Sequence, residues 1–255
     1  MLSTIIGNML RAPQIFFAKN SVKRTLKPFK INLAEYSHAD YEKIIPTLEA
    51  IDNKLKKVPL SKDGMRWIHE GNTVYFYGQK KFHIPYQQFI QRVDICHAGT
   101  FYRDSISVDT QLVESDQFCK AVRQAVRVVA LPQPNYAAFL GKGNLDVYKL
   151  EKIDYHPDSQ KLWMLTVHSP NGSALCDDGY LCFKQADDGQ ATQVSFLACQ
   201  NFPPPPLMAL IFLDRWQWLK QVLTEDAYRR FFRNMMHNLD AEYHGLNHQV
   251  GQAAH

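Results

Sequence analysis

His168 is the side chain whose type and position best suit proton transfer. It ends a strand-like run that begins at Trp163, and a histidine at a strand end beside a cavity can act as a general acid or base near neutral pH. No serine or cysteine nucleophile motif accompanies it. We therefore treat His168 as the one catalytic candidate, and a hydrogen-bonded surface histidine is the alternative interpretation.

Metal ligation is not expected from the other histidines and cysteines. His244 and His248 are four residues apart, but Gly245 lies between them and no carboxylate follows at ligand spacing, so residues 246–255 are interpreted as a polar tail. The cysteines show no zinc-like pairing, and their odd number without a secretory hydrophobic segment favours a reducing compartment. We expect them to be small apolar residues in or near the core, and we expect no metal and no cofactor. The five are Cys96, Cys119, Cys176, Cys182 and Cys199.

The absence of other motifs narrows the classes of function. The sequence has no phosphate-binding glycine loop, no GxSxG or HExxH motif and no dinucleotide fingerprint. A net charge of +4, and no aromatic and basic strand signature, argue against a nucleic-acid partner. No segment reaches the roughly 18 apolar residues that a membrane span requires, so we expect no transmembrane helix.

The elements that must position functional groups are mostly strands in the second half of the chain. Hydrophobic residues make up 45% of the 255 residues and charged residues 21%, values typical of a globular protein with a buried core. From residue 105 onward, strand-like runs alternate with turn signals, including Asp177 to Gly179 and Asp187 to Gly189. This spacing predicts an antiparallel meander. The predicted strands are residues 105–112, 136–140, 145–155, 161–168, 173–176, 179–185 and 191–200.

Helices are predicted within and after the meander. The first begins near Ser115, a favourable N-cap, and ends before Pro132. Residues 207–222 form a second helical stretch, and Thr224 is predicted to cap a third helix that stops at Gly245. The apolar stripe of this last helix consists of Tyr228, Phe231, Phe232, Met235, Met236, Leu239 and Tyr243.

Residues 35–104 are predicted to form an extension made of a helix and a hairpin. A helical stripe runs through residues 37–57, where Pro46 is expected to break or kink the helix. Residues 73–77 and 82–84 have the pattern of two strands joined by a turn at residues 78–80.

Residues 1–34 form a basic amphipathic segment with six basic residues and no acidic one. Three interpretations remain open: a mitochondrial transit peptide, a membrane-surface anchor, and a helix that packs its apolar face on the domain. The rest of the chain is close to charge balance, so the positive charge is a property of this segment. The six residues are Arg11, Lys19, Lys23, Arg24, Lys27 and Lys30.

Counted from Ser105, the predicted order is strand, helix, six further strands and a long terminal helix. This order, with the glycine-rich meander and the final run from Phe231 to Leu239, resembles the START-like or SRPBCC superfamily, also called the helix-grip fold, over residues 105–245. The resemblance implies an α+β fold in which a curved antiparallel sheet grips a long C-terminal helix, here with an N-terminal helical and hairpin extension. It also implies a hydrophobic cavity that members use to bind lipids, sterols, quinones or polyketides, and that a few use for cyclisation or dehydration.

Bulky side chains of the sheet and of the last helix are expected to line that cavity. Methionine suits ligands of variable shape, although the same side chains would also suit a filled core. The predicted lining residues are Tyr148, Trp163, Phe196, Tyr228, Phe231, Phe232, Met235 and Met236.

Three functions follow from these observations. The leading hypothesis is binding or carriage of a hydrophobic small molecule, at a membrane surface if residues 1–34 anchor the chain. The second is a cofactor-independent cyclase or dehydratase that uses His168 or a tyrosine, and the third is a protein-interaction module with a filled core. We expect a cytoplasmic protein, peripheral to a membrane if the anchor interpretation holds and organellar if residues 1–34 are a transit peptide.

Overall fold

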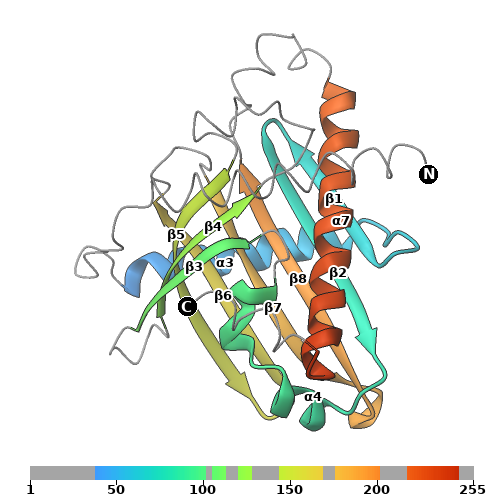
Figure 1. Ribbon diagram of the computed structural model, residues 1–255. Helices are drawn as coiled ribbons and strands as arrows, with labels where there is room; N and C mark the ends of the chain where they lie inside the picture. Colours follow the sequence, from blue (N-terminus) through green and yellow to red (C-terminus); the bar gives the residue numbers. More distant parts are fainter. Residues whose placement is uncertain are drawn as a thin grey trace.

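The computed structural model describes residues 38–101, 105–112, 120–127, 144–168, 176–201 and 217–246. Within them lies one eight-stranded antiparallel sheet with the strand order β1-β2-β8-β7-β6-β5-β4-β3 (Figure 1). The strands are β1 (Met65–Glu70), β2 (Thr73–Phe82), β3 (Ser105–Leu112), β4 (Lys120–Arg127), β5 (Asn144–His156), β6 (Ser159–His168), β7 (Cys176–Ala186) and β8 (Ala191–Asn201). The helices are α3 (His38–Lys56), α4 (Tyr86–Arg92), η2 (Ile95–Phe101), η3 (Asp187–Gly189) and α7 (Gln217–Tyr243).

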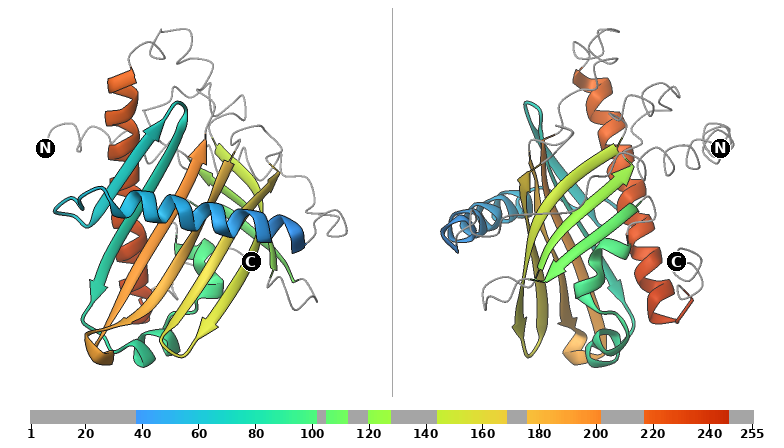
Figure 2. Two further views of the ribbon diagram at one scale, coloured as in Figure 1. Left: turned by 180° about the vertical axis from the view of Figure 1, so that it is seen from behind. Right: turned by 60° about the vertical axis from the view of Figure 1, so that its left-hand side comes forward.

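Helices cover both faces of this sheet. The sheet curves around the long helix α7 on its concave side, and α3 crosses the opposite side (Figure 2). The short helices α4 and η2 lie on the same side as α7 and close the lower end of the concave face (Figures 1 and 2). The predicted fold class, a curved antiparallel sheet gripping a C-terminal helix with an N-terminal helical and hairpin extension, is confirmed.

Alternation along each strand separates two hydrophobic clusters. On β7, Leu181 and Phe183 belong to the cluster that contacts α7 and α4, whereas Tyr180 and Cys182 belong to the cluster that contacts α3. This is the period of two expected of a strand that is buried on both faces. A residue's parity on its strand therefore determines which helix it meets.

The helix α7 approaches the sheet closely at Gly78 of β2. A Cβ atom at this position would lie 2.6–2.9 Å from the ring carbons of Phe232, so the helix rests directly on the strand backbone. Phe76, two residues earlier on the same face, stacks on Tyr228 with ring centroids 5.0 Å apart. The predicted turn at residues 78–80 is therefore wrong: these residues lie within β2, and the missing Cβ of Gly78 leaves room for the ring of Phe232.

The hairpin in this region lies one strand earlier than the pattern predicted. It is formed by β1 and β2, which pair from Met65↔Gly78 to Glu70↔Thr73. β2 then pairs along its other edge with β8, from Thr73↔Asn201 to Phe82↔Thr192, so the hairpin extends the sheet. The order of strand, short helices, six strands and long helix is present, but it begins at β2 rather than at Ser105.

Three other local predictions were wrong. The predicted helix from Ser115 is replaced, where the chain is described, by β4, whose Lys120–Arg127 run pairs with both β3 and β5. The helix α3 continues through Pro46 without a break. No helix begins at Thr224, because α7 runs uninterrupted through it.

The end of α7 agrees with the prediction. Gly245 has φ +72°, the left-handed conformation that glycine adopts at low cost. The Leu246 amide donates to the Ala241 carbonyl and the Gly245 amide to that of Glu242, which is the Schellman arrangement.

The two Asp-Asp-Gly sequences have different structures. Asp187 and Asp188 both have positive φ and form the turn η3, as predicted. Asp177 and Asp178 instead lie within β7, so the predicted turn there is wrong. Position 179 is a glycine because a Cβ there would lie 2.0 Å from the Leu197 carbonyl oxygen of the neighbouring strand.

Several predictions lie outside the described residues. They concern the basic segment 1–34, the strand at 136–140, most of the helical stretch 207–222 and the tail beyond Leu246. Among the residues described, no helix is long and apolar enough to cross a membrane.

Candidate functional site

Most of the predicted lining residues pack together between the sheet and α7. Phe196 of β8 and four residues of the helix are buried in the same cluster, and Phe231 packs against its edge. Phe196 and Phe231 are in contact, with ring centroids 5.5 Å apart. The four helix residues are Tyr228, Phe232, Met235 and Met236.

Trp163 lies elsewhere. On β6, Leu162 and Met164 face α7, so Trp163 between them faces α3 and packs against Tyr180. Its indole N–H donates to Asp154 at 2.6 Å. The structure thus separates Trp163 from Phe196 and from the predicted lining residues of α7 by the thickness of the sheet.

His168 and Tyr148 are paired in register on β6 and β5. The structure describes the backbone of these two residues: His168 is the last residue of β6, and Tyr148 lies within β5, next to Lys149. Their proposed roles stay predictions.

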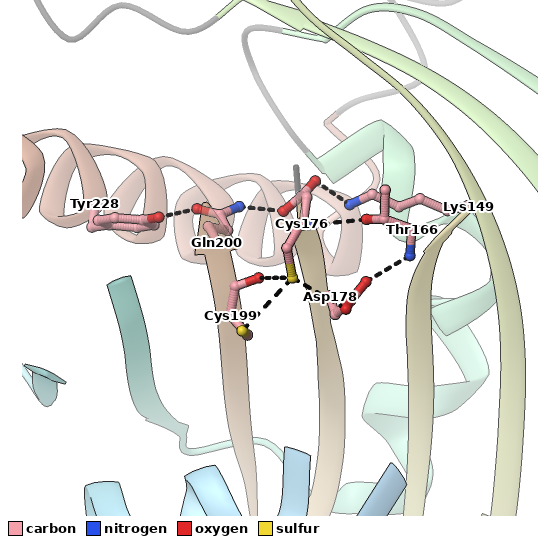
Figure 3. Close-up of polar contacts among 8 residues, drawn as sticks. Lys149, Thr166, Cys176, Asp178, Cys199, Gln200 and Tyr228 are labelled. Carbon is pink, nitrogen blue, oxygen red and sulfur yellow. Dashed lines mark hydrogen bonds and ion pairs between the residues drawn. The ribbon is translucent and has the colours of Figure 1, made fainter. Parts of the chain in front are cut away.

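A row of polar side chains crosses the concave face next to that end. Each member lies two or four residues along its strand from a residue of the hydrophobic cluster that contacts α7, and therefore points to the same face of the sheet. The pairs on each strand are Lys149 and Ile153, Thr166 and Met164, Asp177 and Leu181, and Gln200 and Ala198. Register aligns Lys149 with Thr166 and Asp177 with Gln200. With Tyr228 of α7, these residues form what we call the polar row (Figure 3).

The members of the polar row bond to one another in sequence. Tyr228 donates its hydroxyl hydrogen to Gln200 Oε1, and the Gln200 amide donates to Asp177 Oδ1. Lys149 Nζ forms an ion pair with Asp177 Oδ2 at 2.5 Å. The Asp177 amide donates to Thr166 Oγ1 at 3.0 Å, which ties β7 to β6.

These charges are almost completely removed from solvent. Lys149 is 4% exposed and Asp177 is 5% exposed, and Glu151, two residues from Lys149 on the same face, is also buried. Burial, together with the negative charge of Asp177, raises the pKa of the Tyr228 phenol well above its usual value. Tyr228 therefore keeps its proton and acts as a hydrogen-bond donor.

A second group lies directly behind the polar row, on the face toward α3. Cys176, Asp178 and Cys199 alternate with Asp177 and Gln200 along β7 and β8. The Cys176 thiol donates to Asp178 Oδ2 at 3.2 Å, and Asp178 Oδ1 accepts the Thr166 amide at 2.7 Å. Burial raises the pKa of the Asp178 carboxyl above its usual value.

The polar row was not predicted from the sequence. Asp177 was assigned to a turn, and Lys149 lay in a predicted strand without any reason to single it out. The signal that was present is parity: counted back from Leu181 and Phe183, Asp177 falls on the inward face. Over the described residues, no group of three or more His, Cys, Asp or Glu is arranged to hold a metal ion.

No protein-family model matches the sequence, and the search of curated proteins found no match. Several solved structures are similar at low identity. Human StAR-related lipid transfer protein 5 is 12% identical with a TM-score of 0.44, covering 78% of this chain and 97% of that chain. Human STARD10 is 10% identical with a TM-score of 0.46, covering 75% and 79%. The Zhui aromatase/cyclase from Streptomyces sp. R1128 is 13% identical with a TM-score of 0.41, covering 71% and 98%.

All these TM-scores lie below 0.5, so the fold is assigned from the chain's own elements. A strand, two short helices, six antiparallel strands and a long helix held across the concave face are the START-like, helix-grip arrangement. The fold by itself does not determine the function, which depends on the residues placed on that face.

Proposed function

We propose that the chain binds a hydrophobic small molecule with one polar end, between the concave face of the sheet and α7. The apolar part would contact Phe196, Phe231 and the methionines of α7, and the polar end would meet the polar row. The buried ion pair between Lys149 and Asp177 is the observation that carries this proposal.

Burying charged side chains is costly. Removing two charges from water costs several kcal/mol per ion, and replacing such a pair with apolar residues is often neutral or stabilising. A core that served only to hold the fold would therefore gain little from Lys149 and Asp177. Their position in a line with Gln200 and Tyr228, on an otherwise apolar face, suits recognition of a polar group entering from the strand ends.

The bonds of the polar row also define what it can offer. Tyr228 supplies a hydroxyl that stays protonated, Gln200 supplies an amide, and Lys149 and Asp177 supply both charges. A hydroxyl or carbonyl group on the ligand could replace one internal hydrogen bond without leaving a buried group unpaired. We therefore expect a ligand whose polar end is small and uncharged.

Native mass spectrometry of protein purified from its own host, followed by solvent extraction, tests ligand binding. We expect a reproducible apolar compound that carries a hydroxyl or carbonyl group. The binding of two fluorescent probes, cis-parinaric acid and NBD-labelled cholesterol, then tests whether the chain has a site for apolar molecules. The proposal is rejected if no compound is extracted and neither probe binds displaceably.

Two matched substitutions locate the site. Tyr228→Phe removes the hydroxyl at the end of the polar row and should weaken binding of the extracted compound by about tenfold. This factor corresponds to the loss of one hydrogen bond of roughly 1.4 kcal/mol. Tyr77→Phe is the control, because Tyr77 is also buried and hydrogen-bonded, to Gln79 at 3.0 Å, but faces α3. Equal weakening by both substitutions would show that the ligand does not contact the polar row.

The convergence of acid, base and phenol also supports a second candidate, a cofactor-independent cyclase or dehydratase. Tyr228 would donate a proton or hydrogen bond to a carbonyl oxygen, with Asp177 or His168 accepting a proton. Incubating the extracted compound with fresh protein distinguishes the two functions. Recovery of the unchanged compound supports carriage, whereas loss of one water molecule or ring formation supports catalysis.

We further propose, from the sequence, that residues 1–34 bring a cytoplasmic protein to a membrane surface. Six cations without an acid near apolar residues favour anionic lipid surfaces. Flotation with phosphatidylcholine vesicles, with and without phosphatidylserine, should show binding of the full chain to the anionic vesicles. Unchanged flotation after deletion of residues 1–34 would exclude this segment as the contact.

A further inference from the structure

Two cysteine side chains meet on the face of the sheet opposite to the polar row. Cys176 opens β7 and Cys199 lies near the end of β8, with their sulfur atoms 3.7 Å apart. The register places Cys176 opposite Asn201 and Cys199 opposite Asp178, so the two cysteines are diagonal neighbours on adjacent antiparallel strands. Both are only half-buried, which leaves the pair within reach of a small reagent.

The surroundings of the two sulfur atoms differ. The Cys176 thiol has two oxygen acceptors besides the other sulfur, Asp178 Oδ2 at 3.2 Å and the Cys199 carbonyl at 3.3 Å. The two sulfur atoms are also within hydrogen-bond distance of each other, and either of them can be the donor. This hydrogen bond lowers the pKa of the Cys199 thiol, while the same bond and burial raise the pKa of the Cys176 thiol.

We propose that Cys176 and Cys199 form a redox-active pair that a hydroperoxide converts reversibly into a disulfide. The Cys199 thiolate attacks one oxygen of hydrogen peroxide, breaks the O–O bond and becomes a sulfenic acid, while the leaving hydroxide takes the proton that the Cys199 thiol released and forms water. Cys176, after losing its proton, attacks the Cys199 sulfur, forms the S–S bond and expels hydroxide, which that proton converts to water. Two thiols lose two electrons and two protons, and one peroxide becomes two waters.

The reaction requires the two sulfur atoms to approach and the strand ends to shift. A disulfide has sulfur atoms about 2.05 Å apart, so the sulfurs must approach by less than about 2 Å. Diagonal neighbours in an antiparallel sheet lie about 7–8 Å apart, whereas a disulfide usually spans a Cα separation of about 4.4–6.8 Å. Formation of the bond is therefore expected to draw the start of β7 toward β8.

The pair is directly connected to the polar row through the chain. Cys176 precedes Asp177 and Cys199 precedes Gln200, and these two neighbours bond to each other on the other face. A shift of β7 against β8 changes the bonds that hold Lys149 and Tyr228. If the proposed function holds, oxidation should change the affinity for the bound compound at least about threefold, which corresponds to roughly 0.65 kcal/mol.

The chemical test uses the reduced full-length chain without ligand. The protein is treated with hydrogen peroxide, alkylated with N-ethylmaleimide and digested with trypsin. We expect a dithiothreitol-sensitive cross-link between peptides 162–184 and 185–215, which contain Cys176 and Cys199. The first peptide also contains Cys182, so fragmentation must place the bond at Cys176. A bond at Cys182, or loss of thiols without this cross-link, would overturn the proposal.

Single substitutions assign the two roles. Cys176→Ser should abolish the cross-link and leave a sulfenic acid at position 199 that dimedone labels. Cys182→Ser, at a buried cysteine on the same face, is the matched control and should cross-link like the unsubstituted chain. We expect Cys199 to react about tenfold faster than Cys182, in line with its greater thiolate character. Equal reaction rates at these two positions would contradict the assignment of Cys199 as the attacking sulfur.

The ligand arm of the test is separate. Displacement of cis-parinaric acid is measured with the oxidised and the reduced chain. A cross-link that forms without any change in binding would retain the redox pair and reject its coupling to the polar row. Absence of binding in both states would reject the proposed function and leave the chemical result standing.

Discussion

The ion pair between Lys149 and Asp177 makes the most specific prediction about stability. Replacing one member leaves the other charge buried, and breaking a buried pair in this way costs about 3–5 kcal/mol. Both side chains are nearly inaccessible, at 5% and 6% exposure, so solvent cannot compensate. We therefore expect Lys149→Met and Asp177→Asn each to lower the free energy of unfolding by about 3–5 kcal/mol.

The double substitution distinguishes a buried pair from two independent residues. With both charges removed, the amide NH2 group of the asparagine remains without an acceptor, at a cost of about 1–3 kcal/mol. The double variant should therefore be more stable than either single variant. Urea unfolding followed by circular dichroism, with the slope against urea compared among variants, measures the three differences.

The control is an ion pair of the same kind at the surface. Lys81 pairs with Asp187 at 2.9 Å, with side-chain exposures of 43% and 51%. Lys81→Met should change the free energy of unfolding by about 0–1 kcal/mol, because solvent screens the pair. A double variant in which the losses at Lys149 and Asp177 simply add would refute a coupled buried pair, as would losses no larger than the loss at Lys81.

Three further substitutions have defined outcomes. Gly78→Ala should lower the free energy of unfolding, measured in urea, by about 1–3 kcal/mol, because the new Cβ would clash with the ring of Phe232. The added substitution Phe232→Leu should recover part of this loss, and a neutral Gly78→Ala would show that α7 does not rest on β2. Asp178→Asn should gain stability relative to the unsubstituted chain as the pH rises from about 3 to 7. Burial raises the pKa of Asp178 in the folded chain, so the unfolded chain releases this proton at a lower pH, and the unsubstituted chain loses stability between the two pKa values. A difference independent of pH would contradict this assignment. Tyr86→Phe should be neutral or stabilising by up to about 1 kcal/mol, because no partner for the buried Tyr86 hydroxyl is present in the described part of the chain, and a clear loss of stability would reveal one.

The layout of the second half of the chain could be predicted from the sequence because its strands alternate and its final helix has a continuous apolar stripe. The strands β5, β6 and β8 lie close to their predicted bounds. Gly245 ends α7 for the expected reason, its left-handed conformation. These features depend on local patterns, and local patterns are what a single sequence shows.

The errors arose where a distant segment determines the local structure. Gly78 has the sequence signal of a turn, but the ring of Phe232, more than 150 residues away, explains why a glycine is there. The Lys120–Arg127 run contains good helix formers, yet β3 and β5 pair with it on both sides. Asp177 and Gly179 likewise have a turn composition, while the reason for them is the approach of β8 and the ion pair with Lys149.

The candidate site was therefore only partly predictable. The aromatic and methionine residues of α7 followed from helical spacing, and the structure places them under the sheet as expected. Trp163 was misassigned because a single sequence does not state which face of β6 is concave. The polar row depends on four strands being in register, which no motif in the chain records.

The pairing of β2 with β8 has a consequence for biosynthesis. Thr73 pairs with Asn201 and Phe82 with Thr192, so the ribosome adds more than a hundred residues after β2 before its partner β8 is made. At roughly 5–20 residues per second, the ribosome leaves β2 without this neighbour for about 5–25 s. During that time the β1 hairpin can protect one edge of β2, while Phe76 and the other edge remain open to wrong partners. A nascent chain of this protein is thus expected to depend on chaperones until β8 has left the exit tunnel, and to aggregate if synthesis stops before that point.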